Sequence, residues 1–428
     1  NGIEWTISRL KSLKVDLLRR RTGLPSLTWI RKNRKGDISG PFGALFRWSD
    51  KDDKNFRIAL QAMMVYSVFV YPKATEKQML KFRSSVMADP YPIDVFLNRM
   101  VSQESKRFFD SSPLPVPMAL LAYEGSSVKK SPRLFGSKST IQSENVADEL
   151  RIFNTSGGMY LYGKYKRIFE PILLGFESRK RFLSLGNVSN FSYTPHVGHI
   201  ALLQEPGGKL RSVASPYRLF QMALKPLGDR LFRILKRLPW DCTHDQSAAF
   251  VPIRDALGKG KTVYSVDLSS ATDYFPLEIQ VACLQSIIPE SDHDHINLWV
   301  ELCRGRWNLD KEEIRWTRGQ PLGMYPSFAA FGLTHGFLLK SLLRRKWNGE
   351  FYVVGDDVVI LDDQLASDYM KTLERMGCPY SADKTLQSSQ IAEFAGKIIT
   401  SSKVFPQMKW RELSDDNFLD LCRALGPR

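Results

Sequence analysis

The stretch Phe351–Leu361 reads FYVVGDDVVIL, and its pattern is the strongest indication of the fold. Two runs of β-branched and aromatic residues flank Gly355, Asp356 and Asp357, a pattern typical of a β-hairpin with a tight turn. Such a turn presents two carboxylates at the ends of two apolar strands. A Gly-Asp-Asp sequence alone is weak evidence of chemistry, because acidic residues are common in turns, so its interpretation depends on the segments around it.

A further acidic residue follows another predicted strand. Lys261–Val266, KTVYSV, is typical of a buried strand and ends directly at Asp267. Ser327–Leu343 lies between this strand and the hairpin, and its apolar content predicts a largely buried helix. Carboxylates bounded by apolar strands are costly unless a positive group satisfies them, and hard divalent cations are the common remedy. Two magnesium ions about 4 Å apart are what in-line phosphoryl transfer uses.

Three segments together resemble motifs A, B and C of viral RNA-dependent RNA polymerases. They are DLSSATDYFP at 267–276, GQPLGMYPS at 319–327 followed by Thr334 and His335, and VGDDVVI at 354–360. The residues of these three segments are most similar to the motifs of the narnavirus, mitovirus and ourmia-like (botourmiavirus) group. EPGGKLRSVASP at 205–216 is similar to motif F, DCTHDQ at 241–246 to a block before motif A, GCPYSADKT at 377–385 to motif D, and EFAGK at 393–397 to motif E. The resemblance covers about residues 195 to 400.

The resemblance implies a catalytic set of four residues. Asp267 and Asp356 are expected to be the principal ligands of two Mg²⁺ ions, for which Mn²⁺ can substitute, and Asp357 an auxiliary ligand. Lys384 is expected to be the general acid that protonates pyrophosphate, although a lysine in a loop could equally be a surface charge.

The resemblance also implies nucleotide-binding residues. Lys209 and Arg211 are expected to grip the incoming triphosphate, with a solvated basic hairpin as the alternative. Asp273 corresponds to the residue that senses the ribose 2′-hydroxyl, with a helix-capping Asp as the alternative. Ser327 and Thr334 are expected near nucleotide and template. Many plus-strand polymerases place an asparagine in motif B, which this chain lacks at the comparable stretch, so the mode of ribose selection stays open.

The fold implied is an α+β right-hand polymerase. It has a ferredoxin-like antiparallel palm, mainly helical fingers, and a thumb that is reduced or missing in this segment. The expected boundaries are fingers at 1–260, palm with motif A at 261–276, a fingers insertion at 277–318, palm with motifs B to E at 319–400, and the start of a thumb or a C-terminal tail at 401–428.

The amino-acid composition indicates which kinds of protein this chain can be and which kind of molecule it binds. The 428 residues are 43% apolar and 25% charged, which excludes a disordered chain. Sixty-one Lys and Arg against 45 Asp and Glu leave a net charge of +16, a surplus typical of proteins that bind a polyanion. Five scattered cysteines argue against a disulfide framework and a zinc site. The longest apolar run, Leu60–Tyr71, is too short to cross a bilayer, so no membrane span is predicted.

Residues 1–40 predict a basic amphipathic helix that lies on RNA, on a membrane, or docked on the protein body.

The expected activity is replication of a positive-strand RNA virus genome by two-metal nucleotidyl transfer. RNA template, RNA product and NTPs are the expected partners, and no protein partner can be specified. The expected compartment is the host cytoplasm, with the mitochondrion as the alternative. One rival is a reverse transcriptase, although that class typically has a Tyr-x-Asp-Asp turn where Val353–Asp357 reads VVGDD. The other rival is an RNA-binding protein that keeps the palm fold without catalysis.

Overall fold

The structure is a computed structural model of the 428-residue chain. It describes residues 2–26, 29–34, 38–92, 94–117, 127–130, 139–141, 151–173, 194–382, 384–407 and 410. Most of the segment 401–428 that was expected to begin a thumb or tail therefore lies outside the described residues.

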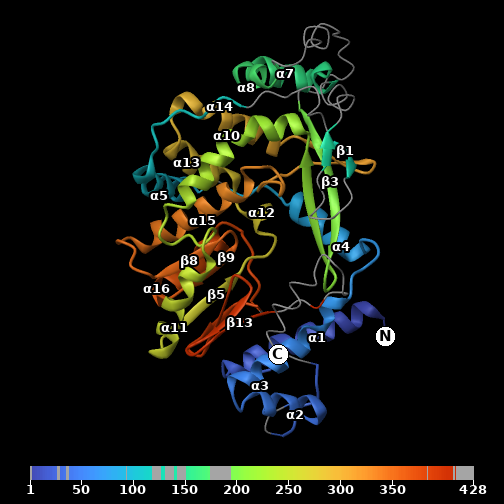
Figure 1. Cartoon of the computed structure of the whole chain (residues 1–428), viewed down its shortest axis with the longest axis vertical. Coiled ribbons are helices and arrows are strands. Elements are labelled where there is room, and N and C mark those ends of the chain that lie inside the picture. Colours follow the sequence, from blue (N-terminus) through green and yellow to red (C-terminus); the bar gives the residue numbers. More distant parts are fainter. Residues whose placement is uncertain are drawn as a thin grey trace.

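An antiparallel sheet of four strands carries the predicted acidic segments (Figure 1). Along the chain its elements are β5 (Val263–Asp267), α15 (Ser327–Leu343), β8 (Phe351–Val354), β9 (Asp357–Ile360), α16 (Asp363–Arg375) and β10 (Leu386–Ser388). The strand order is β10-β5-β9-β8, and every neighbouring pair is antiparallel. This β-α-β-β-α-β arrangement is ferredoxin-like. The predicted strand, buried helix, hairpin and antiparallel palm are confirmed.

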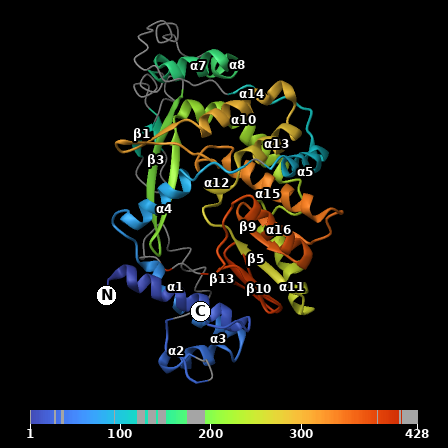
Figure 2. The same ribbon diagram turned by 180° about the vertical axis from the view of Figure 1, so that it is seen from behind.

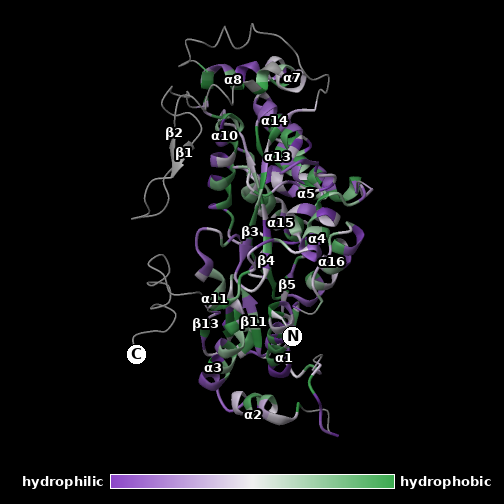
Figure 3. Ribbon diagram, turned by 90° about the vertical axis from the view of Figure 1, so that its right-hand side faces the viewer, coloured by the Kyte–Doolittle hydropathy of each residue, from purple (hydrophilic) through white to green (hydrophobic). Residues whose placement is uncertain are grey.

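Every residue of α15 except Phe328 is buried, because other elements surround the helix. It packs against α5 (Val95–Ser105), α10 (Arg218–Leu235), α13 (Leu277–Ile287), α16 and β8. A helix that is apolar all round is stable only when it is enclosed in this way. A Cβ at Gly336 would lie 2.6 Å from Trp240 Nε1, so glycine permits the close approach of this helix to the indole. In Figure 3 hydrophobic colours are found along the helices of this layer.

A second sheet contains a long hairpin. β3 (His196–Glu205) pairs with β4 (Lys209–Pro216) from Gly198 to Glu205. β3 also pairs in parallel with β6 (Arg306–Leu309), which is followed by its antiparallel partner β7 (Glu312–Ile314). The segment that resembles motif F and the expected insertion at 277–318 thus share one sheet. The boundaries assigned to the subdomains stay predictions.

A third sheet is formed by β11 (Ile391–Phe394), β12 (Lys397–Thr400) and β13 (Val404–Pro406). Its first turn is the EFAGK segment, in which Ala395 and Gly396 have φ of 49° and 69°. Positive φ at both central residues is the requirement of a type I′ hairpin turn.

The N-terminal helices dock on this third sheet. α1 (Ile3–Arg21) and α3 (Asp53–Met63) form a core with β11, β12 and β13, to which Leu13, Leu17 and Phe405 contribute fully buried side chains. Figure 2 shows α1 beneath the β3–β4 hairpin, next to β13. Of the three placements considered for the basic amphipathic helix, docking on the protein body is the one observed.

The remaining α-helices and strands lie around these three sheets. They are α2 (Gly40–Ser49), α4 (Glu76–Val86), α7 (Ser156–Lys164), α8 (Lys166–Leu173), α11 (Phe250–Gly258), α12 (Ala271–Tyr274) and α14 (His293–Cys303), and a small pair of strands is formed by β1 (Ser127–Lys130) and β2 (Ser139–Ile141). Among the helices described, none is both long and apolar enough to cross a membrane.

Candidate active site

The ends of two palm strands bring acidic residues together. In the register of β5 and β9, Asp267 lies directly opposite Asp357. Residues directly opposite in an antiparallel pair point to the same face of the sheet. Asp356 is in the two-residue turn between β8 and β9, whose other residue, Gly355, has φ of 58°. Segments about ninety residues apart therefore meet at one edge of the sheet, as expected, while the roles of their carboxylates stay predictions.

The electrostatics of this edge are unfavourable in the absence of a cation. The pKa of Asp357 is raised to about 7, first by loss of hydration and then by the negative charges of Asp356, Glu393 and Asp267. Lys209 acts in the opposite direction. Asp357 nevertheless keeps an exposed surface, so an ion can reach it. A carboxylate cluster without a matching positive charge is what a hard, oxygen-binding cation would satisfy.

Lys384 supplies part of the missing charge. Its Nζ lies 3.1 Å from Asp267 Oδ2, and both side chains are substantially exposed, at 63% and 40%. Ion pairs of this kind contribute roughly 0–1 kcal/mol, so a ligand can displace the contact. Among the described residues, no three Asp, Glu, His or Cys side chains are gathered as a ready-made metal-binding group. The donor type and clustered charge fit Mg²⁺, whereas a closed ligand set is not formed in this arrangement.

The two predicted phosphate-binding residues begin β4 and differ in their surroundings. Lys209 is exposed and close enough to Asp357 to lower its pKa. Arg211 Nε lies 2.9 Å from Glu205 Oε1 in an ion pair within the hairpin. The structure thus brings Lys209 towards the acidic edge, whereas Arg211 has to leave Glu205 before it can bind a phosphate.

The tip of the β3–β4 hairpin is held by the N-terminal region. Lys11 Nζ donates to Gly207 O at 2.7 Å, and Gly207 N donates to Phe69 O at 2.8 Å. Gln78 Nε2 donates to Gly208 O at 2.9 Å. The two glycines have φ of 80° and 65°, a conformation that glycine adopts without strain. These contacts could not be predicted from residues 195–400 alone.

Basic side chains from several elements gather at the same place. The pKa of Lys11 is lowered first by burial and then by Lys384, Lys209, Lys81 and Lys14. Four other ammonium groups, from α1, α4, β4 and the loop before β10, thus lie within electrostatic reach of Lys11. Convergence of like charges is unfavourable without a polyanion, so this cluster is suited to a phosphate-bearing ligand.

Asp273 is engaged by two protein partners. Its Oδ1 accepts from Trp316 Nε1 at 2.9 Å and its Oδ2 accepts from Ser85 Oγ at 2.8 Å. Burial raises the pKa of this carboxyl, while the two hydrogen bonds lower it. A contact with a ribose hydroxyl requires one of these hydrogen bonds to share its oxygen or to break.

Two predicted nucleotide-binding residues, Ser327 and Thr334, have buried hydroxyls. Ser327 is 1% exposed and donates to Pro321 O, which stabilises the loop before α15. Thr334 is fully buried and donates to Ala330 O at 2.8 Å within its own helix. Both hydroxyls are thus buried and already donate within the protein, so a direct contact with a nucleotide would require them to become exposed. Their expected position near nucleotide and template stays a prediction.

A buried histidine contacts the acidic turn instead. His335 Nδ1 lies 2.8 Å from Gly355 O, and its Nε2 lies 2.7 Å from the Tyr369 hydroxyl. Burial lowers the pKa of this fully buried imidazole to about 4, so it is neutral at pH 7. The sequence placed His335 in the motif B segment, but Tyr369 belongs to α16, and no spacing rule indicated their contact.

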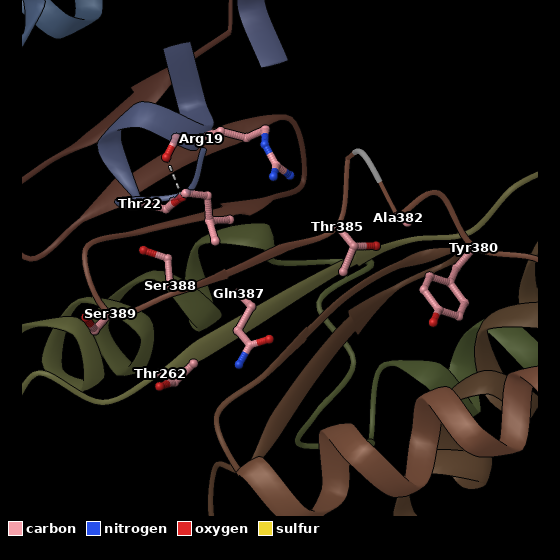
Figure 4. A pocket seen from close by; sticks show the side chains of 10 residues that line it. Arg19, Thr22, Thr262, Tyr380, Ala382, Thr385, Gln387, Ser388 and Ser389 are labelled. Carbon is pink, nitrogen blue, oxygen red and sulfur yellow. Dashed lines mark hydrogen bonds between the residues drawn. The ribbon is translucent and has the colours of Figure 1, made fainter. Parts of the chain in front are cut away.

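A separate pocket of about 550 Å³ lies beside the loop that carries Lys384 (Figure 4). Arg19 and Thr22 come from the end of α1, and Thr385, Gln387 and Tyr380 from the loop and strand opposite. None of the predicted catalytic, metal-binding or nucleotide-binding residues lines it. The pocket is therefore distinct from the acidic edge.

Comparison with known proteins identifies relatives of this chain. A family model described as mitovirus RNA-dependent RNA polymerase matches residues 125–417, which is more than half of the chain. An RNA-directed RNA polymerase of Cryphonectria parasitica mitovirus 1 is 32% identical over 209 residues, or 48% of this chain. The match covers 26% of that relative, so the chain spans about a quarter of its length. An uncharacterized mitochondrial protein of Arabidopsis thaliana is 28% identical over 40% of this chain and 90% of its own length.

Solved structures show the same fold. Two structures of the RNA-dependent RNA polymerase of a human picobirnavirus superpose with a TM-score of 0.51 over 83% of this chain, at 15% and 13% identity. The superpositions cover 71% and 68% of the two picobirnavirus chains. The right-hand polymerase fold and the family resemblance inferred from the sequence are confirmed.

Proposed function

The chain belongs to the mitovirus RNA-dependent RNA polymerase family, and we propose that it transfers a nucleoside monophosphate from an NTP to the 3′-hydroxyl of an RNA, on an RNA template. The product released is pyrophosphate. In this proposal the chain serves replication of a positive-strand RNA virus genome. The observation that carries it is the pairing of Asp267 with Asp357 beside the turn that holds Asp356, in a chain of this family.

The residues at the acidic edge have separate tasks in this proposal. Asp267 and Asp356, assisted by Asp357, would hold two Mg²⁺ ions, or Mn²⁺, which when bound activate the 3′-hydroxyl and stabilise the leaving pyrophosphate. Lys209 would bind the triphosphate, as its exposed ammonium next to Asp357 supports. Lys384 would leave Asp267 and donate a proton to the pyrophosphate oxygen.

The main test is primed RNA synthesis by the full chain with Mg²⁺. We expect Asp267→Ala and Asp356→Ala to remove detectable nucleotide incorporation while RNA binding stays within twofold of wild type. Asp255→Ala, which removes an exposed carboxylate on α11, is the matched control and should retain full synthesis. A wild-type chain that binds RNA but does not synthesise under any divalent cation would instead support the non-catalytic alternative.

The identity of the nucleotide separates the polymerase from a reverse transcriptase. On one RNA template, NTPs should be incorporated efficiently and dNTPs poorly. Efficient use of dNTPs with poor use of NTPs would contradict the proposal. The same assay tests Asp273: Asp273→Ala should weaken discrimination between NTP and dNTP, and unchanged discrimination would remove the proposed role of this carboxylate.

The compartment and the macromolecular partners also belong to the proposal. RNA template and product fit the net charge of +16 and the lysine cluster around Lys11. The host cytoplasm and the mitochondrion both remain candidates, and the similarity to a plant mitochondrial protein makes the mitochondrion the first place to test. Fractionation of cells that express the chain would distinguish them.

A further inference from the structure

A chain of two hydrogen bonds links the α16 helix to the acidic turn through His335. A carbonyl oxygen can only accept, so Nδ1 of the neutral imidazole carries the proton and donates to Gly355 O. Nε2 is then the acceptor, and the Tyr369 hydroxyl donates to it. The two partners therefore determine the tautomer of the ring. His335 and Tyr369 are both fully buried, and their rings stack with centroids 5.7 Å apart.

We propose that His335 is a positioning residue that fixes the turn carrying Asp356 and Asp357, so that their carboxylates are held in the orientation in which they bind metal. This inference rests on the proposed function. It assigns to a residue of the motif B segment a task in the geometry of the motif C turn.

Packing alone does not account for a histidine at this position. The ring packs beside the aromatic rings of Phe331 and Phe275, with centroids 5.5 and 6.3 Å away, where an apolar side chain would pack without losing hydration. A buried imidazole is tolerated because both of its nitrogens are hydrogen-bonded. One of the two bonds ends on the backbone of the acidic turn, which indicates what the polar ring contributes there.

The turn is constrained from a second side as well. Gly355 has φ of 58°, and a Cβ on it would lie 2.8 Å from the Phe328 ring. Packing by Phe328 limits where the Cα can move, whereas the bond from His335 fixes the carbonyl and thus the rotation of the peptide that leads to Asp356. Groups that orient metal ligands in this way typically change metal affinity or activity by about 10- to 100-fold when they are removed.

Four variants of the full chain separate positioning from packing. An Asn at 335 can place its amide nitrogen near the position of Nδ1, whereas a Gln places it near Nε2 and a Leu has no donor. We expect His335→Asn to keep kcat within about fivefold of wild type, and His335→Gln and His335→Leu to lower kcat by roughly 10- to 100-fold with the KM for NTP nearly unchanged. Tyr369→Phe, which leaves the bond to Gly355 in place, should lower kcat by only a few-fold.

A second readout does not depend on synthesis. Binding of Mn²⁺ to the chain, measured from the electron paramagnetic resonance signal of the free ion, should weaken about tenfold in His335→Leu and remain near wild type in His335→Asn. Leu339→Ala, another fully buried position of α15, serves as the control. It should lower the melting temperature while kcat and Mn²⁺ affinity stay unchanged.

Two results would overturn the inference. One is a His335→Leu protein with wild-type kcat and Mn²⁺ affinity; the other is a His335→Asn protein as impaired as His335→Leu, since the bond to Gly355 would then not be the cause. If His335→Leu does not fold, the comparison of His335→Asn with His335→Gln decides by the same criteria. Failure here leaves wild-type synthesis and its loss in Asp356→Ala intact, whereas failure of the proposed function abolishes both.

Discussion

The acidic turn between β8 and β9 and the glycine-rich tip of the β3–β4 hairpin are held in place by different means. The turn is fixed from the core by His335, which is fully buried and hydrogen-bonded on both nitrogens. The hairpin tip is fixed from the surface by Lys11 and Gln78, whose contacts are only part-buried. Hydrogen bonds shielded from water are stronger than those that water can replace. From this difference we expect the turn that is proposed to bind metal to be rigid, and the hairpin tip that is proposed to bind phosphate to adjust.

The strongest effect is expected when the acidic turn between β8 and β9 loses a proposed metal ligand. Asp356→Ala should lower nucleotide incorporation by about 10³-fold or more, because loss of a metal ligand removes several kcal/mol of transition-state stabilisation. Single-turnover incorporation measures this effect. If the variant retained more than a tenth of the wild-type rate, Asp356 would not be required for catalysis.

The next effect is a decrease in the free energy of unfolding at low pH, caused by protonation of His335. The pKa of His335 is about 4 in the folded chain, against 6.5 when unfolded, so the folded state requires the neutral ring. This contribution to stability is complete above pH 6.5 and is lost as pH falls from 6.5 towards 4. At about 1.4 kcal/mol for each pH unit the loss is roughly 3 kcal/mol.

Urea unfolding at pH 4.5 and pH 7 measures that loss. The free energy of unfolding of wild type should fall more than that of His335→Asn, which has no group to protonate at this position. Equal falls in the two proteins would show that the ring is not held neutral by the fold.

A smaller effect is expected when the β3–β4 hairpin loses Lys209, the residue that is proposed to bind the triphosphate. Lys209→Ala should lower kcat/KM for NTP by about 10- to 100-fold, since hydrogen bonds to charged groups contribute roughly 1.5–3 kcal/mol. Arg211→Ala should cost less, because Arg211 is already paired with Glu205. A larger effect at Arg211 than at Lys209 would reverse the assignment of the two residues.

The smallest effect is expected at the support of the hairpin tip. Lys11→Met removes the bond to Gly207 O but keeps the aliphatic part of the side chain. We expect the KM for NTP to rise by about three- to tenfold with kcat nearly unchanged, as for the loss of one hydrogen bond. Lys77→Met, which removes an exposed lysine of α4, is the control and should have no effect. A fall in kcat without a change in KM would contradict an adjustable tip.

Much of the palm was predictable, because its signals are local. The β-branched runs around Gly355 and before Asp267 fixed the strand type, and the apolar content of residues 327–343 fixed the helix. The residues that resemble motifs A and C then indicated that Asp267 and Asp356 meet, which no local pattern could establish.

The rest depends on contacts between distant segments. Thr334 and His335 are neighbours in one enclosed helix, and the sequence does not say which of them contacts the turn; the packing of α16 against α15 decides it. Lys11 meets Gly207 across 196 positions, and the parallel pairing of β6 with β3 joins segments about a hundred residues apart. Neither contact leaves a periodic signal in the chain.

The central claim is that Asp267, Asp356 and Asp357 share divalent cations. The decisive measurement is a crystal structure of the full chain with Mn²⁺ and an NTP, in which the anomalous scattering of Mn²⁺ is used to locate the ions. We expect anomalous peaks within coordination distance of Asp267 and Asp356, with Lys384 moved away from Asp267. Crystals in which the NTP is bound but Mn²⁺ lies away from these carboxylates, with the ion pair to Lys384 intact, would contradict it.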